Sequence, residues 1–185
     1  MDQPGGRPLV PVPRLRYAAH LAKRFFGSLR PGGPAAGDEA WALASLVPGE
    51  QELWRRMSGP DRRHAVGVAR RVVVALGGDD RVDRAVVAAA LLHDVGKVDA
   101  ELGTFARSAV TAATLVAGRD RVAAAAGERS RASRYLRHDV IGAGLLAAAG
   151  SAPLTVAWAR EHHLPPSAWT LPPDVAAALK SGDDD

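Results

Sequence analysis

The stretch "AVVAAALLHDVGK", residues 85–97, decides the fold. It opens with eight uninterrupted apolar residues, and a run of that length is buried whether it forms a helix or a strand. The run ends in His93 and Asp94, two polar and titratable side chains, which are followed by Gly96 and Lys97. Burying a carboxylate beside an imidazole costs free energy unless a partner compensates both groups. The sequence therefore predicts that this pair binds something in the interior.

The composition around this stretch favours a helical protein. A chain of 185 residues, 47% hydrophobic and 24% charged, can bury one well-filled core. Alanine is abundant, aromatic residues make up only 5%, and the chain shows neither strand-like alternation nor an internal repeat. We therefore expect an all-α fold. The expected helices span 14–30, 38–47, 49–57, 60–76, 82–95, 119–126, 138–149, 153–163 and 173–182, with another within 99–117.

The composition also excludes several classes of protein and of site. Cysteine is absent, which rules out disulfide frameworks, thiolate zinc sites and cysteine nucleophiles. The net charge of +4 and a basic face on 14–30 permit a nucleic-acid or membrane-surface partner without requiring one, and a surface helix is the simpler interpretation of that segment. No apolar run is long enough to span a membrane, and prolines interrupt residues 1–13, which we expect to be disordered. We expect a cytoplasmic protein, and no sequence feature indicates an oligomeric state.

Four of the expected helices carry a potential metal ligand in line with apolar positions. Residues four apart share a helix face, so Val68 places His64 on the inner face and Trp158 places His162 there. The full set is His64, His138, His162 and Asp183. Taken singly, such a histidine is more often a hydrogen-bonded core residue, and the terminal "DDD" is more often solvated. Together with the buried His-Asp pair, these residues predict a metal centre.

The residue types indicate which metals and which chemistry to expect. Imidazole and carboxylate ligands suit one or two divalent ions of Fe, Mn, Zn, Ni or Co, with Mg as a further candidate. Asp94 has two carboxylate oxygens and can bridge two ions. A metal lowers the pKa of its bound water, which then attacks a phosphoryl centre. Lys97, three residues further on, can place an ammonium group on a substrate phosphate.

The order and spacing of these residues resemble the HD-domain superfamily of metal-dependent phosphohydrolases, and "LLHDVGK" is similar to the signature of that family. The resembling series is His64, His93-Asp94, His138, His162-His163 and Asp183. The resemblance implies a helical bundle over 58–185, with 14–57 as a helical N-terminal extension. It implies one metal held by His64, His93, Asp94 and Asp183. A second metal would be supported by His138 and by His162 or His163.

The resemblance implies a phosphohydrolase that cleaves a phosphoester or phosphoanhydride of nucleotide type. From their chemistry, we expect Asp94 and Lys97 to be its catalytic residues. One alternative is a non-catalytic HD module that binds a metal or another ligand in signalling. A basic nucleic-acid-binding helical protein is the third hypothesis, and it depends only on the positive charge and the segment 14–30.

Overall fold

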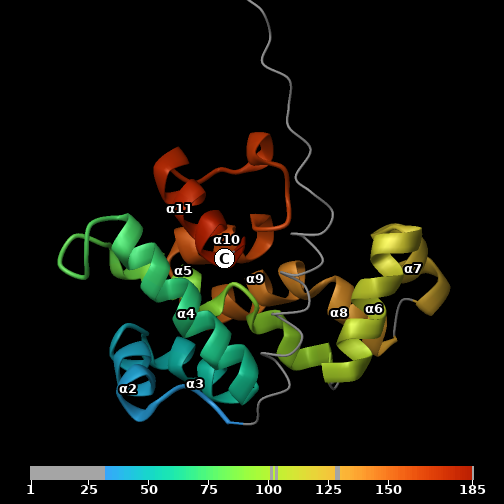
Figure 1. Ribbon diagram of the computed structural model, residues 1–185, viewed down its shortest axis with the longest axis horizontal. Coiled ribbons are helices and arrows are strands. Elements are labelled where there is room, and N and C mark those ends of the chain that lie inside the picture. Colours follow the sequence, from blue (N-terminus) through green and yellow to red (C-terminus); the bar gives the residue numbers. More distant parts are fainter. Residues whose placement is uncertain (1–31, 101, 103, 128–129, 185) are drawn as a thin grey trace, which may run out of the picture.

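The described part of the protein is entirely helical (Figure 1). A computed structural model describes residues 32–100, 102, 104–127 and 130–184, and no β-strand occurs among them. The elements are α2 (Ala36–Ala44), α3 (Pro48–Arg56), α4 (Gly59–Ala75), α5 (Arg84–Leu92), η1 (Val95–Ala100), α6 (Thr104–Ala117), α7 (Arg119–Ala126), α8 (Arg131–Leu136), α9 (His138–Ala148), α10 (Pro153–Glu161), η2 (Pro166–Ala168) and α11 (Pro173–Asp184). The all-α class is confirmed. The disorder expected for 1–13 and the helix expected at 14–30 lie outside the described residues.

Helix α5 is the centre of the bundle. Every residue from Val86 to Leu92 is buried, as the uninterrupted apolar run predicts. The Asp83 side chain caps the helix by accepting a hydrogen bond from the Ala85 amide at 2.7 Å. Helices α4, α10 and α11 all contact α5, so residues from distant parts of the sequence meet around it.

The expected helix 82–95 ends earlier than predicted. The α-helix stops at Leu92, and Val95–Ala100 form the 3₁₀ helix η1, so His93 and Asp94 lie in the turn between the two. The physical reason is close packing of η1 on α9. A β-carbon at Gly96 would lie 2.6 Å from the Gly142 nitrogen, so the two backbones touch where neither residue has a side chain. His93 and Asp94 therefore lie just beyond the last residue of α5.

Helices α2 and α3 share the same hydrophobic core as α4 and α5. Leu46 and Trp54 are almost completely buried in that core. Glu39 ties the segment to its neighbours, because its carboxylate accepts hydrogen bonds from the Trp54 indole at 2.9 Å and from Arg62 at 2.6 Å. The segment that the sequence presents as an N-terminal extension therefore contributes to the core around α5.

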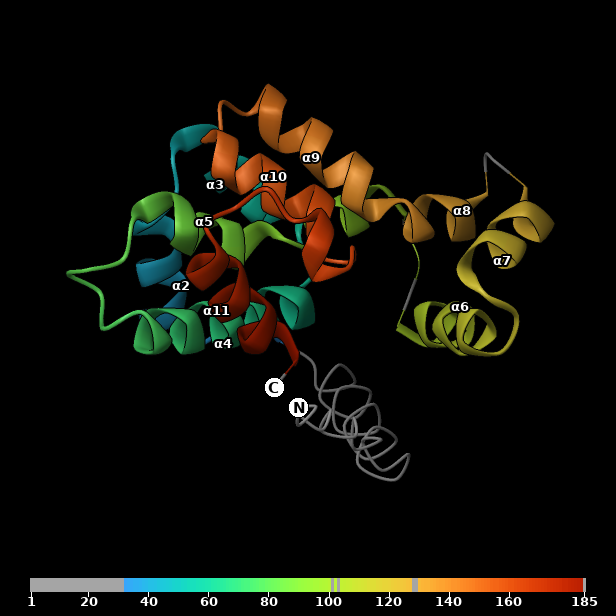
Figure 2. The same cartoon turned by 90° about the horizontal axis from the view of Figure 1, so that it is seen from above.

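Helices α6 and α7 lie to one side of the bundle, and α8 connects them back to it (Figure 2). The sequence did not predict α8 (Arg131–Leu136), a short helix capped by Ser130, whose hydroxyl accepts a hydrogen bond from the Ser133 amide. Helix α8 contacts η1 and leads directly into α9 at His138. None of the described helices is both long and apolar enough to cross a membrane.

Candidate metal centre

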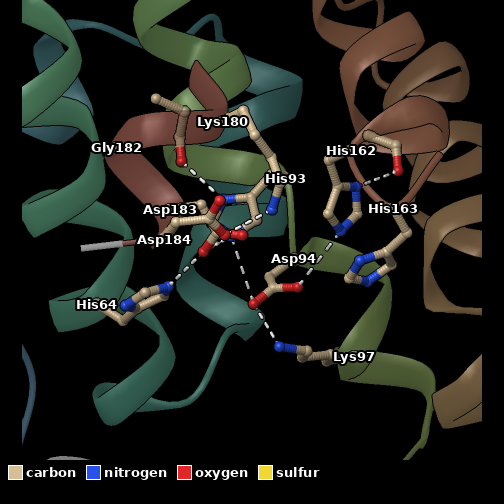
Figure 3. Close-up of polar contacts among 12 residues, drawn as sticks. His64, His93, Asp94, Lys97, His162, His163, Lys180, Gly182, Asp183 and Asp184 are labelled. Atoms are coloured by element: carbon tan, nitrogen blue, oxygen red, sulfur yellow. Dashed lines mark hydrogen bonds and ion pairs between the residues drawn. The ribbon is translucent and has the colours of Figure 1, made fainter. Parts of the chain in front are cut away.

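Histidine and aspartate side chains from distant segments converge beside α5 (Figure 3). They form two groups, and within each group one potential ligand atom per residue lies within 4.8 Å of the others. The first cluster is His64, His93 and Asp183. The second cluster is His138, His162 and His163. Either cluster could hold a metal ion, as the sequence predicts.

The first cluster joins α4, the turn after α5, and the last turn of α11. The Oδ1 atom of Asp183 lies 3.1 Å from Nε2 of His64 and 3.6 Å from Nε2 of His93. His93 and Asp183 are buried, whereas the His64 side chain keeps 29% of its surface exposed. Ligands at about 2.0–2.2 Å from one ion lie roughly 3 Å apart, so this spacing suits a common cation.

The second cluster joins the start of α9 and the end of α10. The Nε2 atoms of His138 and His163 lie 3.1 Å apart, and the rings of His162 and His163 approach to 3.9 Å between centroids. His138 and His162 are buried, while His163 is exposed and marks the open side of the cluster. The sequence left open which of the two adjacent histidines is a ligand. The structure brings both within ligand distance of His138.

Asp94 lies between the two clusters. Its Oδ1 atom is 3.2 Å from Nε2 of His138 and 4.0 Å from Nε2 of His162, on the side of the second cluster. Its Oδ2 atom is 3.5 Å from Nε2 of His93, and it accepts a hydrogen bond from the Lys97 ammonium. Figure 3 shows Asp94 reaching toward both sides. A carboxylate in this position could bridge two ions, one at each cluster.

Three buried histidines are oriented by backbone carbonyls one turn before them. The Nδ1 atoms of His93, His138 and His162 lie 2.9, 2.7 and 2.9 Å from the carbonyl oxygens of Ala90, Tyr135 and Ala159. A carbonyl can only accept, so each Nδ1 carries the hydrogen and each neutral ring offers its Nε2 lone pair to the centre. The three rings stand at or just beyond the ends of α5, α8 and α10, where helix carbonyls lack partners.

Two of these lone pairs make no hydrogen bond within the described part of the chain. They are the buried Nε2 atoms of His93 and His162. Leaving a buried polar atom unsatisfied costs about 1–3 kcal/mol, so such atoms call for a partner. Both atoms lie within 4.0 Å of an Asp94 oxygen, and a transition-metal cation would satisfy them. The donor set therefore fits one or two metal ions.

The electrostatics of the centre favour added positive charge. Burial opposes the ionisation of Asp94, but Lys97 and His93 hold the pKa of its carboxyl well below the usual value. Burial likewise opposes the charge on Asp183, yet His93 and the hydrogen bond with His64 keep its pKa far below normal. Both carboxylates are therefore ionised at neutral pH. An ionised carboxylate is the form that a metal binds.

The two anionic carboxylates and burial shift the pKa values of His93, His162 and Lys97. Burial disfavours protonation of His93, but Asp94 and Asp183 outweigh it and raise the pKa of the imidazole. A cation at the Nε2 atom of His93 is thus favoured. Burial, with His93 as the next cause, lowers the pKa of His162 to about 4, which keeps this ligand neutral. Burial opposes the charge on Lys97 as well, and Asp94 raises its pKa above normal.

All the predicted ligands meet in this centre, and two nearby aspartates do not. Asp184 is exposed and accepts a hydrogen bond from Lys180 at 2.6 Å, and it belongs to neither cluster. Asp139 accepts a hydrogen bond from the Val140 amide at the start of α9. Sequence reasoning missed the supporting carbonyls. Each acceptor lies three residues before its histidine, but the sequence alone does not show which carbonyls are left free, because that depends on where each helix ends.

Comparisons of the chain with protein-family models, with curated proteins and with solved structures find no significant match. The chemistry of the centre therefore carries the functional argument.

Proposed function

We propose that the protein is a metal-dependent phosphohydrolase of the HD-domain superfamily type, which cleaves a phosphoester or phosphoanhydride bond in a nucleotide-like substrate. The observation that supports this proposal most strongly is the position of Asp94, with one oxygen toward each of two histidine clusters. A site that only stabilised the fold would need one closed set of ligands. Two adjacent clusters on a shared carboxylate suit an in-line displacement at phosphorus.

The donor atoms narrow the choice of metal. Five imidazoles and two carboxylates favour Mn, Fe, Co, Ni or Zn over calcium, which prefers oxygen ligands, and magnesium suits the carboxylates alone. His64, His93, Asp94 and Asp183 would hold one ion. His138, His162, His163 and the other oxygen of Asp94 would hold the second. When bound, the ions supply Lewis acidity and a water nucleophile at neutral pH.

The protein side chains supply charge and access. Lys97 places an ammonium beside Asp94, and its side chain is only 15% exposed, so its charge acts in a partly desolvated site. With neutral histidines, Asp94, Asp183 and the neighbouring Lys97 give the centre a net charge of −1, which one divalent ion would reverse. A positive centre attracts a phosphate group. The partial exposure of His64 and the exposure of His163 give a substrate access to it.

Metal analysis followed by a substrate screen tests the proposal. The full chain would be purified without chelator, supplied with Mn²⁺ or Fe²⁺, desalted and analysed for bound metal. It would then be assayed against phosphomonoesters, phosphodiesters and nucleotides with Mn, Fe, Ni or Mg. We expect bound metal and hydrolysis that chelator abolishes. Metal without hydrolysis of any substrate class would favour the non-catalytic module, and no metal above the buffer blank would reject the site altogether.

A further inference from the structure

Arg71 on α4 binds the end of α11 through a single carbonyl. Its Nε and one terminal nitrogen donate to the Gly182 oxygen at 3.0 and 2.7 Å. That oxygen belongs to the peptide unit that joins Gly182 to Asp183. Because a peptide unit is planar, fixing its oxygen also fixes the backbone from which the Asp183 side chain leaves.

Gly182 itself is pressed against α4. It is buried, and a β-carbon there would lie 2.8 Å from a methyl group of Val72 and 3.3 Å from the Val68 carbonyl oxygen. A larger residue could not occupy this position without displacing α4 or α11. The last turn of α11 therefore packs on α4 in one position, and the hydrogen bonds from Arg71 hold it there.

The charge at this helix end gives Arg71 a second role. Asp183 and Asp184 lie in the last turn of α11, where the negative end of the helix dipole disfavours anions. The last carbonyls of a helix also lack intrahelical partners. The guanidinium of Arg71 supplies a cation and two donors at this point. Lys180 pairs with Asp184 on the exposed side and leaves Asp183 to face inward.

We propose that Arg71 is a positioning residue for the first cluster, holding the Asp183 carboxylate against His64 and His93 through the Gly182 carbonyl. Arg71 lies seven residues after His64 on α4, which is two helical turns. Helix α4 thus contacts the last turn of α11 at two points. Arg71 binds the backbone of this turn at the Gly182 carbonyl, and His64 binds its Asp183 carboxylate. This inference rests on the proposed metal function.

The test compares Arg71→Ala with Arg70→Ala. Arg70 is a matched control, because its guanidinium stacks 3.7 Å above the Trp41 ring and bonds to Asp38. Mn²⁺ affinity would be measured by calorimetry on folded full-length protein, and amide hydrogen exchange would be followed in the last turn of α11. We expect Arg71→Ala to weaken Mn²⁺ binding about tenfold, as loss of a group that orients a ligand does, and to speed that exchange. Arg70→Ala should change neither.

Two further variants keep the test decisive. Arg71→Lys keeps the positive charge but cannot donate two hydrogen bonds from a planar guanidinium, so its Mn²⁺ affinity should lie between those of wild type and Arg71→Ala. This variant replaces Arg71→Ala in the test if the alanine variant does not fold. In an Asp183→Asn background, Arg71→Ala should cause no further loss of affinity. A full second loss there, or equal affinities for Arg71→Ala and Arg70→Ala, would overturn the positioning role while leaving the metal site intact. Wild-type protein that binds no Mn²⁺ would overturn both proposals.

Discussion

At the scale of single residues, each buried histidine of the centre is oriented by the helix that precedes it. The Nδ1–H of His93 donates a hydrogen bond to the Ala90 carbonyl. His138 and His162 make the same bond to Tyr135 and Ala159. The helical spacing of His138 and His162, and the apolar run before His93, predicted that these rings face inward. It could not predict which nitrogen faces the centre, because that depends on where each helix ends.

Asp94 and Lys97 should separate metal binding from turnover. Asp94→Ala removes the carboxylate shared by both clusters, so we expect most bound metal and all hydrolysis to be lost. Lys97→Ala removes an ammonium that donates to Asp94 without being a ligand. It should keep its metal and lower kcat by roughly 100-fold, the scale of losing one positioned donor. Metal analysis and steady-state kinetics on both variants check this, and identical behaviour would refute the separate role of Lys97.

The adjacent histidines of the second cluster should contribute unequally. His162 is buried and locked by the Ala159 carbonyl, whereas the exposed His163 must be immobilised when it ligates. We expect His162→Ala to weaken Mn²⁺ binding by at least about tenfold, and His163→Ala to weaken it less. Calorimetric titration of the two variants measures the difference. Equal losses would show that both rings ligate with the same strength.

At the scale of elements, the sequence predicted most helices, including the eight-residue α7 (Arg119–Ala126), but it missed α8 and the break after α5. Helices α4, α9 and α10 begin within a residue of their expected positions, because proline, serine caps and apolar periodicity mark them. The break between α5 and η1 was not foreseen, since it is imposed by contact with α9 and not by local propensity. Helix α8 is too short for periodicity to reveal it.

The contact that creates η1 can be tested by Gly96→Ala. A β-carbon at this position would overlap the His138 carbonyl and lie 2.6 Å from the Gly142 nitrogen, both of which are backbone atoms that cannot rotate away. We expect a loss of about 1–3 kcal/mol in the free energy of unfolding, typical of overpacking. Gly144→Ala is the control, because a β-carbon there meets nothing within 4 Å. Urea denaturation of the two variants gives the comparison, and equal stabilities would contradict the close approach of η1 and α9.

The end of α11 should behave as part of the centre. Asp183 is buried beside His64 and His93, whereas Asp184 has 58% of its side chain exposed and pairs with Lys180. Asp183→Asn should therefore lose metal affinity and activity. Asp184→Asn should stay near wild type, since exposed ion pairs contribute only about 0–1 kcal/mol. Mn²⁺ titration measures both affinities. Full affinity in the Asp183 variant would show that the terminal aspartates are a solvated tail and not part of the centre.

At the scale of the whole molecule, the sequence predicted the convergence of ligands but not what supports it. The inward faces of the ligand-bearing helices were readable from spacing, because burial imposes periodicity on each helix separately. The contact of Arg71 with Gly182 and the approach of α2 and α3 to the core are tertiary, and no local pattern encodes them. Because the centre gathers two carboxylates and two buried imidazole nitrogens that make no hydrogen bond within the described residues, we expect the folded chain to bind metal more tightly than the unfolded chain.

Thermal unfolding should consequently depend on metal. A ligand that binds only the native state stabilises it by about 2.7 kcal/mol when its concentration is about 100 times its Kd. For a domain of this size each kcal/mol raises Tm by about 2–4 °C, so one occupied cluster should raise it by about 5–10 °C. Two occupied clusters should raise it further. Calorimetric scans with Mn²⁺, with chelator and with Asp94→Ala as the control measure the effect. Because Asp94 serves both clusters, its alanine variant should lose most of the shift, and an undiminished shift in that variant would place the bound ion elsewhere on the protein.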